Sequence, residues 1–302
     1  IVKTAKGCEK MFTQLFGYYL LDKGVVTLDQ LGQALAEKST TNVKLGALAI
    51  DSGYMTAEQV DRVHDEQKHV DKKIGDIAVA LEFITEEQVK ELLTKQKTSN
   101  IILSQALIDR GYISNSVFEN ELKEYKRIAE FDEGDLNDKN LAEDIISIYD
   151  LYGLAEKDFY ADYISLLVRN VVRFIGDDFA FLNVKSGEDI IVEYVTDQQL
   201  HGSKTSYTAI GGDEKAFLAF ASRYAGEQLN VCNEYACTAV GEFLNVQNSL
   251  YAENEANLNN IDLSLLPQSA SKNKIFTPDK KQLIVPLSFT FGNMYVCFRT
   301  CG

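Results

Sequence analysis

A carboxylate and a carboxamide, Glu242 and Asn245, stand three residues apart in the helix-like segment NEYACTAVGEFLNVQNSLYAEN. At about 100° per residue, a helix here places them in one narrow stripe with Thr238 and Ser249. Residues three apart are neighbours on a helix surface, so a fixed anion would stand beside an amide that both donates and accepts hydrogen bonds. Such a pair can orient a water molecule. Spacing alone leaves an ordinary solvated helix face as the alternative.

Other reactive residue types lack a spacing that would let them act together. Five cysteines are too few and too unevenly placed for a disulfide framework. Cys297 and Cys301 would share one face of a strand, which leaves a redox pair as an alternative to buried thiols. The histidines His64, His69 and His201 show no metal-ligand spacing. We therefore predict no metal site and no cofactor of the chain's own.

The elements that would hold Glu242 and Asn245 follow in a readable order from about residue 158. A buried helix, DFYADYISLLVRNVVRFIG, precedes three strand-like runs, FAFLNV, DIIVEYV and SYTAIGG. Two helices come next, DEKAFLAFASRYAGEQL and the segment around residue 242. A hairpin comes last, LIVPLSFTF against MYVCFRT, with Gly292 and Asn293 in the turn. The pattern predicts an α+β domain over residues 151–302, with long helices on a largely antiparallel sheet.

The first half of the chain contains four similar segments with a period of 29 residues. Each reads as a short apolar-striped helix, a break, and a hydroxyl residue that caps a second helix. In the middle two segments Gln59 follows Thr56 and Gln88 follows Thr85, the spacing of a capping box. Stacked helix pairs would bury the apolar faces, so residues 1–126 are predicted to be an all-α domain of helical-pair repeats. The aligned positions are Gly17, Gly46, Gly75 and Ser104 in the first helix, and Thr27, Thr56, Thr85 and Ser114 at the cap.

Charge and composition separate the two halves and exclude several classes of function. The run RIAEFDEGDLNDKN has no apolar period, so residues 127–150 are predicted to be an acidic linker. The formal net charge of −15 opposes binding to a nucleic-acid backbone. The apolar runs are shorter than the roughly 20 residues that span a bilayer, and no basic and apolar leader opens the sequence. We expect a cytoplasmic protein that binds no nucleic acid and does not insert into a membrane.

The sequence resembles one family in three features. These are the Glu-x-x-Asn signature at Glu242 and Asn245, the run FASRYAGEQL before it, and the run TAVGEFLNVQNSLYAENEANLNNIDLSLLPQ through it. Together with the order of elements, they resemble the CheX branch of the CheC/CheX/FliY family of chemotaxis phosphatases. Thr238 stands where members often have Ser or Asp. In the earlier helix Asn170 follows an apolar Leu167, so the resemblance implies one active helix, as in CheX rather than in two-site CheC.

That resemblance implies an enzyme of two-component signal transduction, a phosphatase that hydrolyses the aspartyl phosphate of a CheY-like response regulator. The amide of Asn245 would enter the regulator's active site and orient the attacking water, and Glu242 would pair with the regulator's lysine. Thr238, Asn248 and Ser249 would belong to the docking surface. Magnesium would come from the phosphorylated receiver. CheX-like domains pair through sheet edges, so a homodimer is expected.

Two 24-residue motifs separated by five residues occupy the second and third repeats of the first half. They resemble the MshEN-type motifs of type II secretion and type IV pilus ATPases, which bind cyclic di-GMP. The family opens each motif with Arg, which can bond guanine bidentately, whereas Lys44 and Lys73 offer a point charge. His64 and Glu82 replace an aliphatic residue and a glycine. The matching residues are Lys44, Leu45, Gly46, Gly53, Val60 and Gln67 in one motif and Lys73, Ile74, Gly75, Val89 and Gln96 in the other.

Two alternatives to a phosphatase stay open. The chain could be a non-catalytic chemotaxis or flagellar adaptor, or a scaffold whose repeats respond to cyclic di-GMP. A decayed Glu242 and Asn245 pair would indicate an adaptor, so the intact pair favours the enzyme. A plain helical docking module is the alternative to a nucleotide site in the first half.

Overall fold

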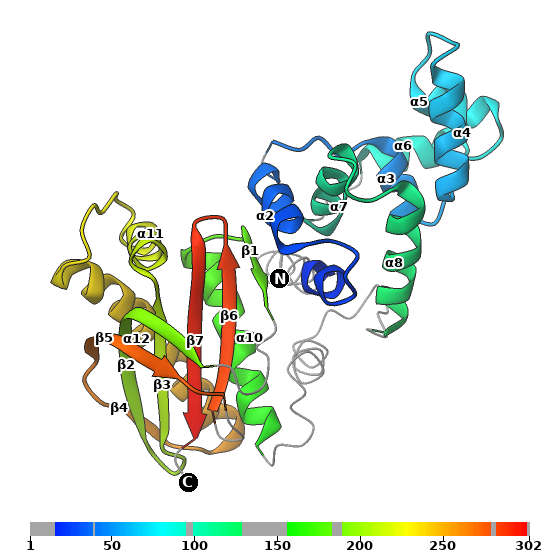
Figure 1. Ribbon diagram of the computed structural model, residues 1–302. Helices are drawn as coiled ribbons and strands as arrows, with labels where there is room; N and C mark the ends of the chain where they lie inside the picture. Colours follow the sequence, from blue (N-terminus) through cyan, green and yellow to red (C-terminus); the bar gives the residue numbers. More distant parts are fainter. Residues whose placement is uncertain are drawn as a thin grey trace. The chain divides into compact units, whose positions relative to one another are not determined.

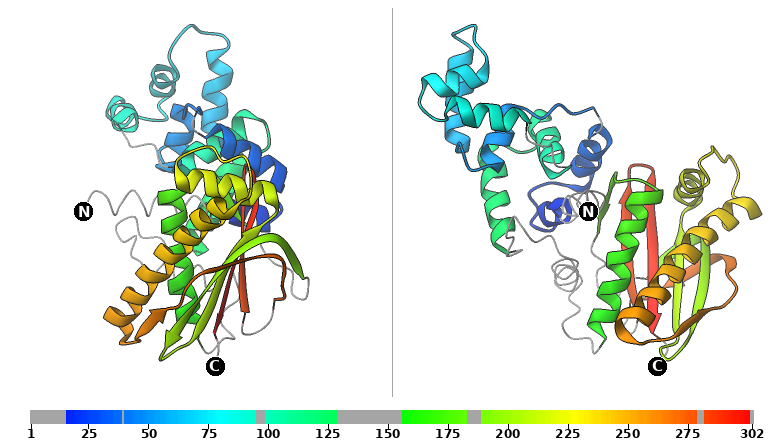
Figure 2. Two further views of the ribbon diagram at one scale, coloured as in Figure 1. Left: turned by 90° about the vertical axis from the view of Figure 1, so that its left-hand side faces the viewer. Right: turned by 180° about the vertical axis from the view of Figure 1, so that it is seen from behind.

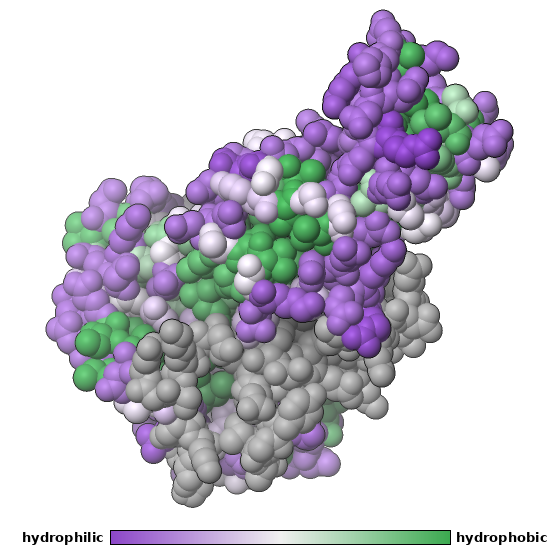
Figure 3. Space-filling view, turned by 45° about the vertical axis from the view of Figure 1, so that its right-hand side comes forward, coloured by the Kyte–Doolittle hydropathy of each residue, from purple (hydrophilic) through white to green (hydrophobic). Residues whose placement is uncertain are grey.

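The computed structural model describes residues 16–38, 40–94, 99–128, 156–182, 189–278 and 282–300. The chain divides into two compact units, Ile1–Leu136 and Asn137–Gly302, called here the helical unit and the sheet unit (Figure 1). Hydrophilic side chains cover much of the surface in Figure 3, as expected of a chain in which 25% of the residues are charged. Within the described ranges, no helix is both long and apolar enough to cross a membrane.

The described part of the helical unit consists of helices and turns. Residues 16–22 are helical, and apolar side chains such as Leu31, Val60 and Leu107 are almost completely buried. The unit therefore has its own apolar core, which is what stabilises helices this short. The further helices are α2 (Leu28–Glu37), α3 (Leu45–Asp51), α4 (Ala57–Gln67), α5 (Ile74–Ala80), α6 (Glu86–Thr94), α7 (Ser99–Asp109) and α8 (Asn115–Ile128).

Residues with left-handed backbone conformation recur every 29 positions in this unit. The φ angle is 67° at Gly24, 68° at Gly53, 59° at Glu82 and 70° at Gly111. Glycine adopts this conformation without strain, whereas a residue with a Cβ atom meets a cost of about 1–2 kcal/mol. Glu82 therefore keeps the turn geometry of the three glycine positions at a cost in stability.

Hydroxyl side chains cap the helices that follow these turns. Thr56 Oγ1 accepts a hydrogen bond from the backbone N–H of Gln59 at 3.3 Å. In return, Gln59 Oε1 accepts one from the backbone N–H of Thr56 at 2.9 Å. Thr85 and Gln88 make the same two bonds. Both predicted capping boxes are confirmed, and a further one joins Thr27 to Gln30 at the start of α2.

Two glycines of the 29-residue pattern are needed for helix packing. A Cβ atom on Gly46 would lie 2.7 Å from Cγ1 of Val60, and one on Gly75 would lie 3.0 Å from Cγ1 of Val89. Both contacts join the first and second helices of one segment, α3 to α4 and α5 to α6. Close packing between helices is therefore sufficient to explain these glycine and valine positions without a ligand.

The sheet unit has an antiparallel sheet with two long helices on one face (Figure 2). The strand order is β1-β6-β7-β3-β2-β4, and β5 also pairs with β2. Every recorded strand pair is antiparallel, so the predicted combination of helices and antiparallel sheet is confirmed. The strands are β1 (Phe179–Phe181), β2 (Ile190–Gly202), β3 (Ser206–Gly212), β4 (Leu263–Leu265), β5 (Ser269–Phe276), β6 (Gln282–Phe289) and β7 (Gly292–Thr300), and the helices are α10 (Lys157–Phe174), α11 (Glu214–Ala225) and α12 (Glu234–Asn259).

Aromatic side chains fill the layer between the sheet and its two long helices. The Tyr163 ring of α10 stacks on the Phe298 ring of β7 with centroids 4.2 Å apart. Tyr251 of α12 meets both rings edge-on. All three side chains are at most 1% exposed. This packing anchors α12 firmly against the sheet.

The turn of the final hairpin and the predicted linker are the two boundaries where the structure differs from the prediction or does not describe it. The final hairpin does form, but Phe289 pairs with Gly292 and leaves Thr290 and Phe291 in the turn, so the placement of Gly292 and Asn293 there was wrong. Gly292 begins β7 instead. The predicted linker at 127–150 lies outside the described residues beyond Ile128, which is the last residue of α8.

Candidate functional site

Helix α12 presents the polar stripe at the surface of the sheet unit. It starts after Asn233, whose side chain accepts from the Ala236 amide, and it ends at Asn260 in left-handed conformation. Phe243 and Leu244 are each 1% exposed and face the core. Because those residues fix the rotation of the helix, Thr238, Glu242 and Ser249 are exposed and Asn245 is half-buried.

Glu242 lies against the segment that connects β4 to β5. Gln268 Nε2 donates to Glu242 Oε1 at 3.3 Å. A Cβ atom on Gly241 would lie 2.1 Å from Gln268 Oε1, so the Gln268 side chain lies directly against the helix at this glycine. Burial raises the pKa of the nearby Tyr224 phenol, and the negative charge of Glu242 adds to that rise. Glu242 is therefore an exposed carboxyl group that a neutral neighbour holds on one side.

Asn245 is held from beneath by Gln198 of β2. Gln198 Nε2 donates to Asn245 Oδ1 at 2.9 Å and to the Leu266 carbonyl at 3.0 Å. Gln198 is 3% exposed, so these bonds are shielded from water and stronger than surface bonds. The half-buried amide is consequently restrained, whereas a solvated asparagine would rotate freely. Gln198, Leu266 and Gln268 are parts of this site that were not predicted from the sequence.

Asn248 does not belong to the docking surface, and its assignment there was wrong. The residue is completely buried. Its Nδ2 donates to Gln198 Oε1 and to Thr208 Oγ1, each at 2.8 Å, and its Oδ1 accepts from the Tyr163 hydroxyl at 3.0 Å. The physical reason is the helix rotation, since Asn248 lies a further ~60° round the helix from Asn245, toward the sheet.

The side chains of Thr238 on α12 and Asn170 on α10 make hydrogen bonds within the sheet unit. The Thr238 hydroxyl donates to the Glu234 carbonyl of its own helix at 2.9 Å. Asn170 of α10 is 4% exposed and donates to Gln247 Oε1 at 2.8 Å. The side chain of Asn170 therefore serves the interface between α10 and α12 and does not reach the surface.

The residues that match the nucleotide-binding motifs are spread over several environments. Lys44 Nζ pairs with Asp109 of α7 at 2.6 Å, Gln67 donates to the Lys72 carbonyl, and Lys73 is exposed before α5. Leu45 is half-buried, Gly46 and Gly75 are buried, Gly53 is exposed in its turn, and Gln96 lies outside the described residues.

A cavity of about 290 Å³ opens beside the first of the two motifs only. Its lining residues come from α3, α4, α7 and the start of α8, and none belongs to the second motif. A much smaller apolar pocket, of about 10 Å³, is lined by Leu45, Gly46 and Val60 of the first motif and by Ile74 of the second. The lining residues of the larger cavity are Lys44, Gly46, Ala47, Val60, His64, Gln105, Ile108, Asp109 and Asn115. Burial lowers the pKa of His64 in this wall, which favours its neutral form.

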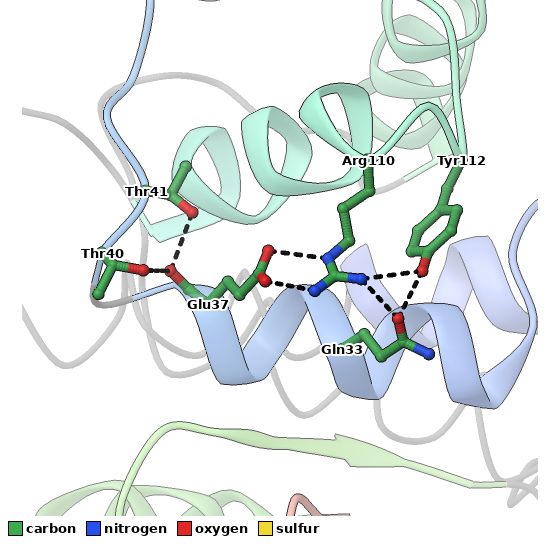
Figure 4. Close-up of polar contacts among 6 residues, drawn as sticks. All are labelled: Gln33, Glu37, Thr40, Thr41, Arg110 and Tyr112. Carbon is green, nitrogen blue, oxygen red and sulfur yellow. Dashed lines mark hydrogen bonds and ion pairs between the residues drawn. The ribbon is translucent and has the colours of Figure 1, made fainter.

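A second polar cluster in the helical unit joins α2 to the turn after α7 (Figure 4). Arg110 bonds both carboxylate oxygens of Glu37, with Nε to Oε2 at 2.8 Å. Arg110 also donates to Gln33 Oε1 at 2.7 Å, and Tyr112 donates to the same oxygen at 2.6 Å. The hydrogen bond from Arg110, together with the Arg110 charge, lowers the pKa of Glu37. The cluster is satisfied internally and is a structural tie between the two elements.

No group of three His, Cys, Asp or Glu side chains suited to a metal ion occurs within the described residues. Carboxylates such as Asp197 have other partners. Burial acts to raise the pKa of Asp197, but hydrogen bonds from Lys274 and Ser269 and the charge of Lys274 outweigh it and lower the pKa. The exposed stripe of α12 offers the carboxyl group of Glu242 and the amide of Asn245.

Comparison with known proteins gives matches among solved structures alone. No known family matches the sequence, and no curated protein matches it. Chemotaxis protein CheX from Vibrio vulnificus is 18% identical, with 48% of this chain and 99% of that chain covered and a TM-score of 0.42. CheX from Desulfovibrio desulfuricans is 12% identical, with 48% and 99% covered and a TM-score of 0.40. The CheX-CheY-BeF3-Mg complex from Borrelia burgdorferi matches at 14% identity, with 48% and 98% covered and a TM-score of 0.36. The matches cover nearly all of each solved chain and about half of this one.

Proposed function

We propose that the sheet unit is a phosphatase that hydrolyses the aspartyl phosphate of a CheY-like receiver domain. The observation that carries the proposal is the arrangement on α12, where an exposed carboxylate and a restrained amide stand one turn apart. Glu242 is exposed, and Asn245 is fixed by Gln198 at 2.9 Å. The Glu-x-x-Asn signature, by its resemblance to the CheX branch, supplies the roles of the two residues.

The chemical demand on such an enzyme is small. An aspartyl phosphate is a mixed anhydride that water already attacks, so the enzyme needs to position a water in line with the breaking bond. The amide of Asn245 performs that positioning after it enters the receiver's pocket. Glu242 pairs with a lysine of the receiver and fixes the docking. The receiver supplies the magnesium ion and the phosphorylated aspartate, so the chain needs no metal ligands.

The helical unit is proposed to be a docking or regulatory module built from helix pairs. The packing of Gly46 on Val60 and of Gly75 on Val89 explains the glycine and valine matches to the nucleotide-binding motifs. The cavity at Lys44 borders one motif and not the other, and the pocket that both motifs line, of about 10 Å³, is far too small for a nucleotide. These two observations favour a helical scaffold over a site for cyclic di-GMP, and titration calorimetry with cyclic di-GMP distinguishes the two by the presence or absence of binding heat.

The test is phosphate release from receiver domains of the source organism, phosphorylated with a small-molecule donor, in the presence of the full chain. Wild type should accelerate release from at least one receiver. Asn245→Ala should lose most of that acceleration while it still binds the receiver, and Glu242→Ala should weaken binding as well as turnover.

A matched control lies on the same helix. Asn257 is exposed on α12 about three turns beyond Asn245, and Asn257→Ala should leave release unchanged. Binding of a phosphorylated receiver without any acceleration of release by wild type would replace the phosphatase by an adaptor. Normal receiver binding by Glu242→Ala would remove the lysine contact from the mechanism.

A further inference from the structure

Gln198 connects Asn245 to the interior of the sheet unit. It lies on β2, 47 positions before Asn245, and both hydrogens of its amide are used. One goes to Asn245 Oδ1 at 2.9 Å and the other to the Leu266 carbonyl at 3.0 Å. The Gln198 oxygen accepts from Asn248 Nδ2 at 2.8 Å. An amide with all of these bonds made, and only 3% exposed, has one orientation open to it.

Two backbone carbonyls fix the direction of every bond in this network. The Leu266 carbonyl can only accept, so the Gln198 atom that faces it is the nitrogen. The Thr208 hydroxyl donates its hydrogen to the backbone carbonyl of Gln198 at 3.0 Å. In its bond with Asn248 Nδ2 the same hydroxyl must therefore be the acceptor. Tyr163 then donates to Asn248 Oδ1. Burial raises the pKa of Tyr163, which keeps that proton in place.

The same logic sets the orientation of Asn245. If its amide were turned over, two NH₂ groups would face each other, and neither could accept. The oxygen of Asn245 therefore points to Gln198. In the described part of the chain, Asn245 Nδ2 donates to no protein acceptor. The nitrogen is the end of the amide that is left for an incoming group.

We infer that Gln198 is a positioning residue that holds the Asn245 oxygen and thereby presents the Asn245 nitrogen to the attacking water. The inference rests on the proposed phosphatase function. An Asn245 N–H that donates to the water oxygen leaves a lone pair of that oxygen free to form the new bond to phosphorus. The bond from phosphorus to the aspartate oxygen breaks, the receiver's aspartate leaves as a carboxylate, and the protons of the water stay with the released phosphate. Gln198 touches neither water nor phosphate, and it acts by limiting the rotation of the amide.

The first measurement is independent of catalysis. Nitrogen-15 relaxation of the Asn245 side-chain NH₂ in the full chain should show an ordered group in wild type and a mobile one in Gln198→Met, which removes the donor and keeps the side-chain length. Gln199→Met is the matched control, because Gln199 is the next residue on β2, exposed on the opposite face of the strand. Equal order of the Asn245 amide in all three proteins would overturn the inference.

The second measurement is steady-state phosphate release. Gln198→Met should lower kcat about tenfold, since small misplacements of a positioning group have large effects on rate, and should change KM less than twofold. In an Asn245→Ala background the same substitution should have no further effect on kcat, because Gln198 acts through Asn245. Equal losses in both backgrounds would show that Gln198 matters only for folding, and would contradict the inference.

A third variant covers the case in which the methionine variant folds poorly. Gln198→Glu keeps the size, and none of the hydrogen-bond partners of the side chain, Asn245, Asn248 and the Leu266 carbonyl, titrates. Burial raises the pKa of the new carboxyl. The protonated acid can donate to Asn245 and the ionised form cannot, so kcat should fall as pH rises through that pKa. A pH profile parallel to that of wild type would contradict the positioning role.

The outcomes separate this inference from the proposed function. If wild type releases no phosphate from any receiver, the phosphatase proposal fails, while the relaxation experiment still shows whether Gln198 orders Asn245. If Asn245→Ala abolishes release but Gln198→Met has the kcat of wild type, the phosphatase stands and the positioning role is wrong.

Discussion

A polar network at the surface of the helical unit joins charged side chains, whereas the network behind Asn245 in the sheet unit joins neutral side chains in the interior. The Arg110 and Glu37 side chains are 34% and 44% exposed. Gln198 and Asn248 are 3% and 0% exposed. Water competes for the bonds of the first network and screens its charges. The second network has no such competition, so each lost partner leaves a buried polar group unsatisfied.

The two networks differ in how strictly they fix the orientation of a polar side chain. Charge makes the Arg110 pair conspicuous, but exposure makes its contribution small. The neutral amides in the interior of the sheet unit fix the orientation of one another. Through its hydrogen bond with Gln198, the half-buried amide of Asn245 is held in one orientation as well.

The largest loss of stability is expected when Asn248, at the centre of the buried network, is replaced. Asn248→Ala leaves the Gln198 oxygen, the Thr208 hydroxyl and the Tyr163 hydroxyl each without a partner that they have in wild type. The free energy of unfolding should fall by about 2–3 kcal/mol. Urea denaturation followed by circular dichroism measures it. An unchanged midpoint would mean that Asn248 is solvated, as the docking-surface assignment had it.

A smaller effect is expected where apolar packing stabilises the helical unit. Gly46→Ala puts a methyl group 2.7 Å from Val60 Cγ1, and the resulting overpacking should cost about 1–2 kcal/mol. Gly32→Ala in α2 is the control, because nothing lies within 4 Å of its added Cβ. It should stabilise by about 0.5–1 kcal/mol through lower chain entropy. Thermal unfolding of the two variants should shift in opposite directions, and a shared direction would refute the packing explanation of Gly46.

The smallest effect is expected from the charged network. Glu37→Gln removes the ion pair with Arg110 and should leave the urea midpoint nearly unchanged, because both side chains are at the surface and open to water. Arg110 lowers the pKa of Glu37, so any contribution of the pair is present above the unfolded-state pKa and is lost as pH falls through the lowered folded-state pKa. Added salt should remove it. A destabilisation as large as that of Asn248→Ala would abolish the contrast between the two networks.

Local signals in the sequence predicted several features of the fold. Capping boxes at Thr56 and Thr85 depend on residues three positions apart, and both form. Helical periodicity placed Glu242 on the exposed face of α12. The same periodicity places Asn248 away from that face, toward the sheet, and the assignment of Asn248 to the docking surface overlooked that angle.

The contacts that hold the site could not be read from local signals. Gln198 and Leu266 lie 47 and 21 positions from Asn245, and only the pairing of β2 with α12 and with the β4 segment brings them together. One signal was available in the strand itself. Gln198 occupies a core-facing position in the alternating run of β2, between the buried Thr196 and Leu200, and a polar residue at such a position requires buried partners.

The initial rate of phosphate release from a phosphorylated receiver, with wild type and Asn245→Ala compared at equal concentration, measures whether the Asn245 amide takes part in the hydrolysis. We predict that wild type accelerates release well above the receiver alone, and that Asn245→Ala loses most of the acceleration with an unchanged unfolding midpoint and retained receiver binding. Equal acceleration by the two proteins would contradict the account, because the oriented amide would then have no part in the reaction.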